Sequence, residues 1–301
     1  MANNEYWSQY WAQGYQTSFG SCFPKGYEGV IKSHWKAIFS NISTNTNVLD
    51  LCTGNASLIR LAKETMSDFS QSNFTGVDYA KVTINDDFEK LENVKVIFDT
   101  NVESLPLISR SFDLIISNFG VEYSDLTKSI TEISRLLKKG GQVELICHCN
   151  QSTIVIANNK ELAMLNTMLS TDNAVDCLEK LIKSLPDKAK AEKWRNDLNF
   201  SLSEITKLYF NELQESEFLK FLKFVLNSNV QDKIKQFNLF KQDVLGHQIR
   251  LNTLSQAALS EERLKKLFRC FNENGLVLTA NNKITNNEGI VAFKISAIKP
   301  N

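Results

Sequence analysis

The sequence predicts an α/β fold built on a mostly parallel, doubly wound sheet with helices over both faces. Between Asn47 and Cys149, amphipathic segments alternate with short apolar runs, namely VLDLC, FTGVD, VKVIFD, FDLIIS and QVELICHC. The runs are rich in β-branched or aromatic residues and are bounded by turn residues, which is typical of buried strands. Strands that alternate with helices favour a parallel sheet joined by helical crossovers.

The remaining segments predict how the chain is divided. Residues 1–45 are rich in aromatic side chains, and we expect an N-terminal helical lid. LTKSITEISRLLKK places Leu126, Ile130, Ile133 and Leu137 at spacings of three and four, which marks one buried helix face. Residues 150–254 contain helical stretches and no convincing strand, so we expect a helical insertion that serves as a substrate cap.

The C-terminal segment returns to the α/β pattern. A helix is expected over Ser260–Asn272, and GLVLTANNKIT and GIVAFKISAIKP then predict an antiparallel hairpin. These two strands have only the first sheet to pair with. We therefore expect residues 46–149 and 255–301 to form one core domain.

Composition narrows the class of protein. Of 301 residues, 43% are hydrophobic, and 34 basic residues balance 34 acidic ones, so no strong field attracts nucleic acid. No apolar run approaches the ~20 residues that span a bilayer, and MANNEYWSQYW does not resemble a signal peptide. The scattered cysteines predict reduced thiols and a cytoplasmic protein. Cys147-His148-Cys149 would suit zinc, but a site needs about four ligands and no second cluster follows, so we expect no metal.

The stretch NVLDLCTGNASLIRLA, residues 47–62, has the pattern of a strand, a ligand-binding loop and a helix. Ligands of open parallel sheets bind beyond the carboxyl ends of the strands. Small residues at Cys52, Gly54 and Ala56 would let the backbone approach a ligand closely. Asp50 lies inside the strand, where a carboxylate needs hydrogen-bond donors, and Asp78 ends the next strand at about the spacing of a ribose ligand.

A dinucleotide-binding enzyme is the competing interpretation of this layout. It expects Gly-x-Gly-x-x-Gly, in which the glycines admit a pyrophosphate to the helix N-terminus. Cys52 and Ala56-Ser57 fit that pattern badly, and Asp50 would repel a phosphate.

Five motifs carry a family resemblance. VLDLCTGNA, GVDYA, NVESLP, SFDLIISNFGVEY and LLKKGGQVELI resemble, in order and spacing, those of class I S-adenosylmethionine-dependent methyltransferases. The resemblance covers about residues 46–149 and the C-terminal hairpin. It implies a Rossmann-like, seven-stranded core that binds S-adenosylmethionine. These enzymes usually carry three glycines after the first strand, and here Cys52 and Ala56 replace two of them.

The resemblance also implies contacts to the methionine portion of the cofactor. Asp50 would orient the loop and the methionine ammonium, while Cys52 and Gly54 would lie in the loop against the methionine. Asn118 would approach the same portion from the fourth strand.

Other residues would hold the adenosine. Asp78 would bind the ribose, and Tyr79 would pack near the adenine. Asn101 stands where an Asp commonly meets the adenine amino group, and Val102 would offer its backbone amide. Asp99, two residues earlier, is the alternative match to Asn101.

Three residues are candidates for catalysis. Glu122 and Tyr123 follow the fourth strand, and His148 ends the fifth. His148 titrates near neutrality and is the preferred general base, although a strand-end histidine bonded to nearby backbone is an equal alternative. Glu122 would otherwise bind an amine, and Tyr123 a hydroxyl.

Methyl transfer is an in-line displacement, so the segments that cover the site should specify the acceptor. Tyr10, Trp11, Tyr15 and Phe19 are candidate substrate contacts in the lid; alternatively, such aromatics anchor a helix to the core. A small-molecule N, O or S nucleophile is the first expectation, a protein or peptide the second and nucleic acid a distant third. A non-catalytic partner protein that binds the cofactor or its product is the alternative of a different class.

Overall fold

The computed structural model describes residues 4–19, 26–82, 84, 87–227 and 230–301. These residues belong to two compact units. The first comprises Met1–Val155 with Gln256–Asn301 and contains the sheet, and the second comprises Ile156–Ser255 and is helical. No helix among the described residues is both long and apolar enough to cross a membrane.

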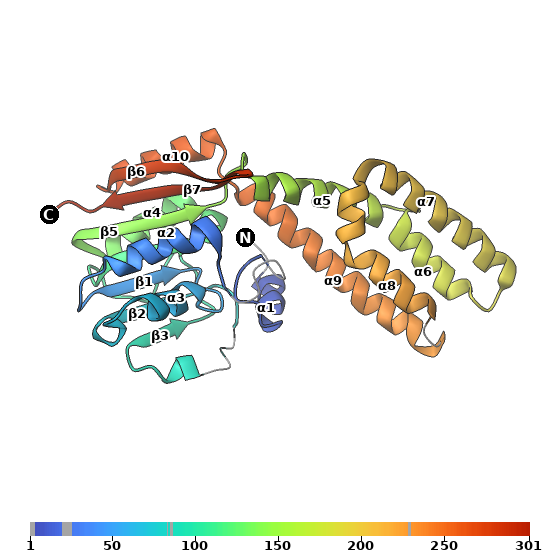
Figure 1. The fold of residues 1–301 in the computed structure, drawn as a ribbon, viewed down its shortest axis with the longest axis horizontal. Helices are drawn as coiled ribbons and strands as arrows, with labels where there is room; N and C mark the ends of the chain where they lie inside the picture. The colour runs from blue at the N-terminus through green and yellow to red at the C-terminus, as the bar shows by residue number, and fades with distance from the viewer. Residues whose placement is uncertain (1–3, 20–25, 83, 85–86, 228–229) are drawn as a thin grey trace. The chain divides into compact units, whose positions relative to one another are not determined.

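One seven-stranded sheet organises the first unit (Figure 1). In chain order its strands are β1 (Asn47–Leu51), β2 (Asn73–Val77), β3 (Val94–Ile97), β4 (Phe112–Asn118), β5 (Leu137–Cys147), β6 (Val277–Asn286) and β7 (Gly289–Ile298). Their spatial order is β3-β2-β1-β4-β5-β7-β6. The first five strands pair in parallel, whereas β7 pairs antiparallel with β5 and β6. The predicted fold class, a mostly parallel seven-stranded sheet with an antiparallel C-terminal hairpin, is confirmed.

Helices cover both faces of this sheet. On one face, α2 (Gly29–Ser40) and α3 (Ser57–Thr65) enclose a core that includes Trp35, Phe39 and Ile59. On the other face, α4 (Leu126–Leu136) and α10 (Glu261–Glu273) enclose a second core. Helix α4 is one residue shorter than its apolar pattern predicts, because Leu137 already begins β5. The short N-terminal helix α1 (Asn4–Ala12) lies beside the carboxyl ends of the strands.

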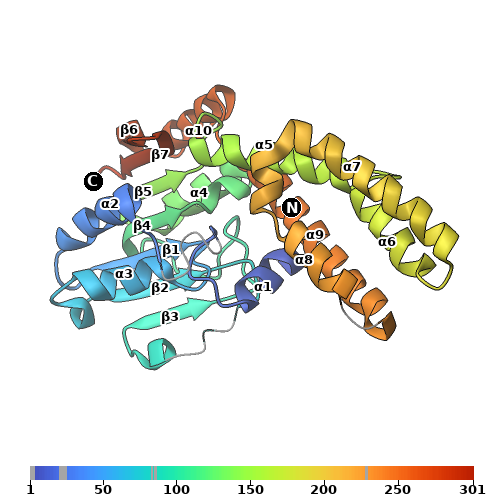
Figure 2. The same ribbon diagram turned by 45° about the vertical axis from the view of Figure 1, so that its right-hand side comes forward.

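The second unit contains helices only. They are α5 (Thr153–Leu169), which begins in the first unit, α6 (Ala174–Ser184), α7 (Lys188–Glu215), α8 (Glu217–Asn227) and α9 (Val230–Ala257), which ends in the first unit. Figure 2 shows α6 and α7 side by side, and α7 is kinked at Tyr209. Phe218 and Phe237 are buried in its core, whereas Phe210 and Phe224 are exposed.

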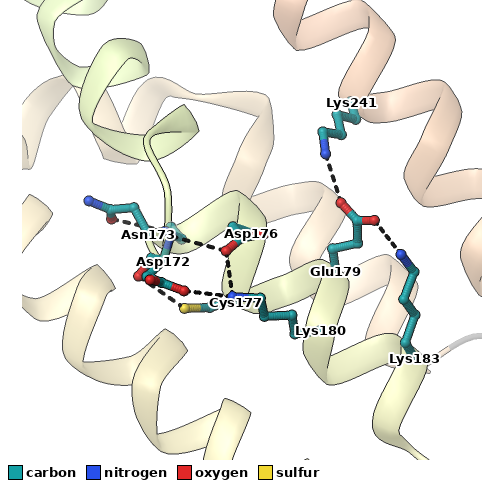
Figure 3. A network of polar contacts seen from close by, with 9 residues as sticks. Asp172, Asn173, Asp176, Cys177, Glu179, Lys180, Lys183 and Lys241 are labelled. Atoms are coloured by element: carbon teal, nitrogen blue, oxygen red, sulfur yellow. Dashed lines mark hydrogen bonds and ion pairs between the residues drawn. The ribbon is translucent and has the colours of Figure 1, made fainter.

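Ion pairs hold α6 in place within this unit (Figure 3). Lys180 binds Asp172 in the preceding turn at 2.6 Å and Asp176 one helical turn earlier at 2.8 Å. Glu179 accepts from Lys183 at 2.6 Å and from Lys241 of α9 at 2.7 Å. These charged side chains of α6 therefore pair with residues of the same unit.

Candidate functional site

The order of the sheet strands reverses between β1 and β4, which are neighbours at its centre. The chain runs outward from β1 to β2 and β3, and then returns to β4 and β5 on the other side. Open α/β sheets bind ligands at this switch point, beyond the carboxyl ends of the strands. The loop after β1 and the ends of β2, β4 and β5 meet there.

The loop after β1 has an unusual backbone. Cys52, Gly54 and Ala56 all adopt the left-handed conformation, with φ of 58°, 52° and 59°. A residue with a side chain pays about 1–2 kcal/mol for that conformation. The loop therefore keeps a glycine-type backbone at the two positions where the sequence carries Cys and Ala.

Asp50 lies under this loop, with only 2% of its surface exposed. Its carboxylate accepts a hydrogen bond of 2.5 Å from the Thr53 hydroxyl. Burial raises the pKa of Asp50 to about 7, although the Thr53 bond opposes this shift and the charge of Asp78 adds to it. A buried carboxylate that is costly to ionise is suited to a cationic ligand, whose charge would favour the ionised form.

A small cavity of about 10 Å³ lies next to Asp50. Its lining comes from the loop, α3, β4 and the segment before α2: Tyr27, Asp50, Cys52, Thr53, Ser57, Leu58 and Asn118. Its volume corresponds to about one water molecule. A broader hollow of about 520 Å³ lies between Val30 and residues 285–288, and none of the predicted site residues lines it.

Asp78 directly follows β2 and fastens the loop. Its carboxylate accepts from the amide of Gly54 at 2.7 Å and from the amide of Ala80 at 2.8 Å. Burial raises the pKa of Asp78 to about 6, and the amide hydrogen bonds counteract part of this shift. Tyr79 follows, and 39% of this residue's surface is exposed.

The residues predicted to contact adenine follow β3, and they make contacts mainly within their own turn. Asn101 uses its side-chain oxygen to accept from the Glu103 amide at 2.9 Å, and Val102 is buried in the core. Asp99, the alternative to Asn101, is exposed and contacts Asn4 of α1 at 3.2 Å and Lys81 at 3.4 Å. Asn101 and Val102 thus shape the turn, whereas Asp99 connects it to α1.

Asn118 ends β4 on the opposite side of β1. Its side-chain oxygen accepts from the Trp35 indole at 2.8 Å. Its side-chain nitrogen is buried and meets the strict hydrogen-bond geometry with no described residue, although it lies near enough to the Tyr27 hydroxyl to favour its ionised form. The structure therefore brings Asp50, Cys52 and Asn118 together around the small cavity, with Gly54 in the same loop.

The three catalytic candidates gather beyond β4 and β5. Glu122 is 1% exposed, and its carboxylate accepts from the backbone amide of His148 at 2.7 Å. Burial raises the pKa of Glu122 to about 7, while the His148 amide, the Cys147 thiol and the Arg263 guanidinium pull it down. The Tyr123 ring meets the His148 imidazole edge-on, with centroids 6.2 Å apart.

His148 differs from the titrating base that the sequence suggests. It is 1% exposed, and burial lowers its pKa to about 3. Its ring stacks on Phe119 at 4.4 Å and lies 6.0 Å from Phe19, and neither ring nitrogen has a partner among the described residues. The imidazole is therefore neutral at pH 7, and among the three catalytic candidates Glu122 is the group that titrates near neutrality.

The N-terminal aromatic residues cover the loop after β1. A Cβ atom on Gly54 would lie 2.6 Å from the Trp11 ring, so that ring rests directly on the glycine. The Asn55 amide donates to the carbonyls of Trp11 at 3.3 Å and Tyr15 at 2.5 Å. Tyr10 is buried and stacks on Tyr15 at 5.0 Å. Phe19 lies apart from this group, against Phe119 and His148.

Sequence reasoning missed several residues of this site. Asn55 donates to the backbone of the N-terminal segment, Trp35 holds Asn118, and Phe119 stacks on His148 with a left-handed φ of 55°. Arg263 reaches Glu122 from a helix 141 residues later in the sequence. Asn55 and Phe119 carried local signals, because Asn55 lies in the predicted ligand-binding loop and Phe119 directly follows a strand end.

Comparison with known proteins gives one assignment. The sequence model of a methyltransferase domain family matches residues 42–199, which is more than half of the chain. No curated protein matches the chain.

Solved structures give only distant likenesses. A chain from the complex between the Haloferax volcanii Trm112 methyltransferase activator and a proposed methyltransferase has 11% identity and a TM-score of 0.48, covering 90% of this chain and 89% of that one. A SAM-dependent methyltransferase from Aquifex aeolicus has 11% identity and a TM-score of 0.45, with 89% of both chains covered. A geranyl diphosphate methyltransferase in complex with SAM has 10% identity and a TM-score of 0.46, covering 89% of this chain and 84% of that one. These likenesses are too distant to indicate an activity.

Proposed function

The chain belongs to the methyltransferase domain family, and we propose that it transfers the methyl group of S-adenosylmethionine to a small-molecule N, O or S nucleophile. The observation that carries this proposal is the meeting of two buried carboxylates, Asp50 and Asp78, at a left-handed loop on the switch point of the sheet. Buried carboxylates without a cationic partner are costly even when neutral groups donate to them, so their presence at this edge favours a ligand with a cationic group and hydroxyls.

The residues at the switch point suit the methionine portion of this cofactor. Asp50 offers a buried negative charge to an ammonium group, and the Asn118 side-chain nitrogen offers a donor to a carboxylate. Gly54 leaves room for close approach because it lacks a Cβ atom. Both the charge and the donor match an amino-acid group.

Asp78 suits the ribose. A carboxylate at the end of β2 can accept from two adjacent hydroxyls, each bond being worth about 1.5–3 kcal/mol. Its oxygens now hold the amides of Gly54 and Ala80, so ribose binding requires lone pairs that these bonds leave free. Tyr79, the amide of Val102, and either Asn101 or Asp99 are the proposed adenine contacts.

When bound, the cofactor supplies an electrophilic methyl group on a sulfonium. The protein has to hold the acceptor in line with it and exclude water, which can contribute about 7–11 kcal/mol to lowering the barrier. Burial of Glu122 and His148, and the aromatic rings around them, keep water from this region.

Glu122 is the proposed proton acceptor when the nucleophile carries a proton. Its pKa of about 7 makes it half ionised near neutrality, where general bases are most effective. His148 would then contribute a neutral imidazole that hydrogen-bonds the acceptor. Tyr123 is the proposed phenolic donor at the same place.

The N-terminal segment is the proposed lid. Helix α1 reaches the ends of several strands, through Ser8 to the Lys81 amide at 2.9 Å and through Trp7 to the Tyr123 ring at 5.8 Å. Trp11 rests on Gly54, where the methionine portion would lie. Trp11 and Tyr15 would therefore have to move when the cofactor binds, and Tyr10 and Phe19 would remain as walls of the acceptor site.

A small acceptor agrees with the enclosed, aromatic surroundings of Glu122 and His148, since small-molecule sites combine apolar walls with few polar groups. Residues 150–254, the helical insertion, are proposed to serve as a substrate cap. The test is a screen with labelled methyl donor against amines, phenols, thiols and carboxylic acids, with a peptide library in parallel. Transfer to a small acceptor that Glu122→Gln abolishes supports the proposal. Transfer to peptides alone contradicts the small-molecule part, and cofactor binding without any transfer favours the partner protein.

A further inference from the structure

Arg263 reaches the candidate catalytic loop from α10, a helix that otherwise packs against α4 and the sheet. Its guanidinium donates to the backbone carbonyl of Glu122 at 2.7 Å and to that of Gln256, near the end of α9, at 2.9 Å. The Ser260 hydroxyl caps α10 and accepts from the Arg263 amide at 3.2 Å. Arg263 therefore joins three chain segments at one point.

Holding the Arg263 side chain in this position costs free energy, which a function in fixing the loop would explain. Arg263 is half-buried, and its Nε is buried with no partner among the described residues. An arginine on a surface helix loses hydration and side-chain entropy when it is held in this way. The contact fixes the backbone of Glu122. The carboxylate of the same residue is held by the His148 amide.

We propose that Arg263 is a positioning residue for methyl transfer, which holds the Glu122 peptide so that its carboxylate meets the acceptor. The inference rests on the proposed role of Glu122 as proton acceptor. A guanidinium is suited to this role because its planar fork binds two carbonyls at once and is always charged. Its charge also favours the ionised form of the nearby carboxylate.

Other titratable groups near Glu122 stay neutral between about pH 5 and pH 8. Burial raises the pKa of each hydroxyl and thiol there and lowers that of the imidazole; the groups are Tyr27, Cys52, Tyr123, Cys147 and His148. Asp50 and Asp78 titrate in the same range, with pKa values of about 7 and about 6. Measurements at saturating cofactor distinguish the titration of Glu122 from that of Asp50 and Asp78, because these two residues belong to the proposed cofactor site.

The experiment compares the wild type with Arg263→Met, Arg263→Lys and, as a matched control, Arg269→Met on an exposed position of the same helix. The kcat at saturating donor is measured from pH 5 to pH 9, together with the Kd for S-adenosylmethionine. Arg263→Met should move the acid limb up by about half a pH unit or more, which lowers kcat at pH 7 about twofold through ionisation, and the loss of positioning should bring the total decrease to about tenfold. Arg263→Lys should keep the position of the acid limb in the pH profile of kcat, because lysine retains the positive charge. It should lose part of kcat, because lysine lacks the planar guanidinium that binds two carbonyls. The Kd should stay within about twofold in all variants.

A second readout does not require activity. Carbon-13 labelled glutamate gives the Glu122 carboxyl titration by NMR, and Glu122→Gln identifies its signal. The Glu122 pKa should rise in Arg263→Met and not in Arg269→Met. An unchanged titration and an unchanged acid limb, whatever the loss of stability, would overturn the inference. If the wild type transfers no methyl group while the Glu122 titration still shifts, the proposed function fails and the contact with Arg263 stands.

Discussion

The backbone amide of Gly54 donates a hydrogen bond to the carboxylate of Asp78 over 2.7 Å. This bond fastens the loop after β1 to the end of β2, and it lies within a site where Asp50, Asp78 and Glu122 are all buried. A protein that buries three carboxylates with raised pKa values should show it in the pH dependence of its stability and its activity.

The first prediction concerns the stability of the protein without cofactor. Burial raises the pKa of Asp50 from 3.8 to about 7, so the folded protein binds this proton more tightly than the unfolded chain does. Its contribution to stability is fully present below about pH 4 and is lost as the pH rises through about 7. The unfolding free energy of the wild type should therefore decrease as the pH rises from 5 to 7. In Asp50→Asn this decrease should be smaller, by up to about 1.4 kcal/mol per pH unit.

Urea denaturation at pH 5, 6 and 7 measures this difference. Asp68→Asn, at an exposed carboxylate, serves as the control and should keep the wild-type slope. Equal slopes for Asp50→Asn and the wild type would show that Asp50 is not buried as described.

The second prediction separates the roles of Glu122 and His148. Glu122→Gln should lower kcat by about a hundredfold, in the range of a lost general base, and remove the rise in kcat as the pH passes through about 7. His148→Gln should instead raise the KM for the acceptor and keep that rise, because burial holds the pKa of His148 at about 3. A pH profile that loses its acid limb in His148→Gln would reverse the two assignments.

The third prediction tests the contact between the lid and the loop. Gly54→Ala should destabilise the protein by about 1–2 kcal/mol through its left-handed backbone, and by more because the new Cβ atom would overlap the Trp11 ring. Trp11→Ala should speed the association of S-adenosylmethionine several-fold by uncovering Gly54.

A double-mutant cycle connects these two changes. Combined with Trp11→Ala, the Gly54→Ala substitution should cost less than it does alone, with a coupling of about 0.5–3 kcal/mol. Stopped-flow fluorescence measures the rate of cofactor association, and denaturation measures the free energies of unfolding. Strict additivity would mean that Trp11 does not rest on Gly54 in solution.

Much of the fold could be predicted because its signals are local. The run VLDLC becomes β1 and QVELICHC becomes most of β5, since buried parallel strands are short, apolar and bounded by turns. The hairpin of β6 and β7 followed from two strand-like runs and an Asn-rich turn. Ser260 caps α10 at the position where the helix was expected to begin.

The candidate site was less predictable because its geometry depends on long-range contacts. A strand-end position indicated His148, but its burial in the folded protein, which lowers its pKa to about 3, has no local signal in the sequence. The spacing of Asp78 indicated a ribose ligand, but not the amide of Gly54 that it already accepts. Arg263 could not be predicted at all, since no local pattern connects it to Glu122.

The central claim is that Asp78 and its loop bind S-adenosylmethionine. Calorimetric titration of the wild type and of Asp78→Asn with S-adenosylmethionine and S-adenosylhomocysteine tests it most directly. We expect micromolar binding by the wild type and a Kd weakened by about tenfold or more in the variant, because a charged acceptor for the ribose is lost. Absence of binding by the wild type would contradict the proposed function, and equal binding by Asp78→Asn would contradict the proposed ribose contact.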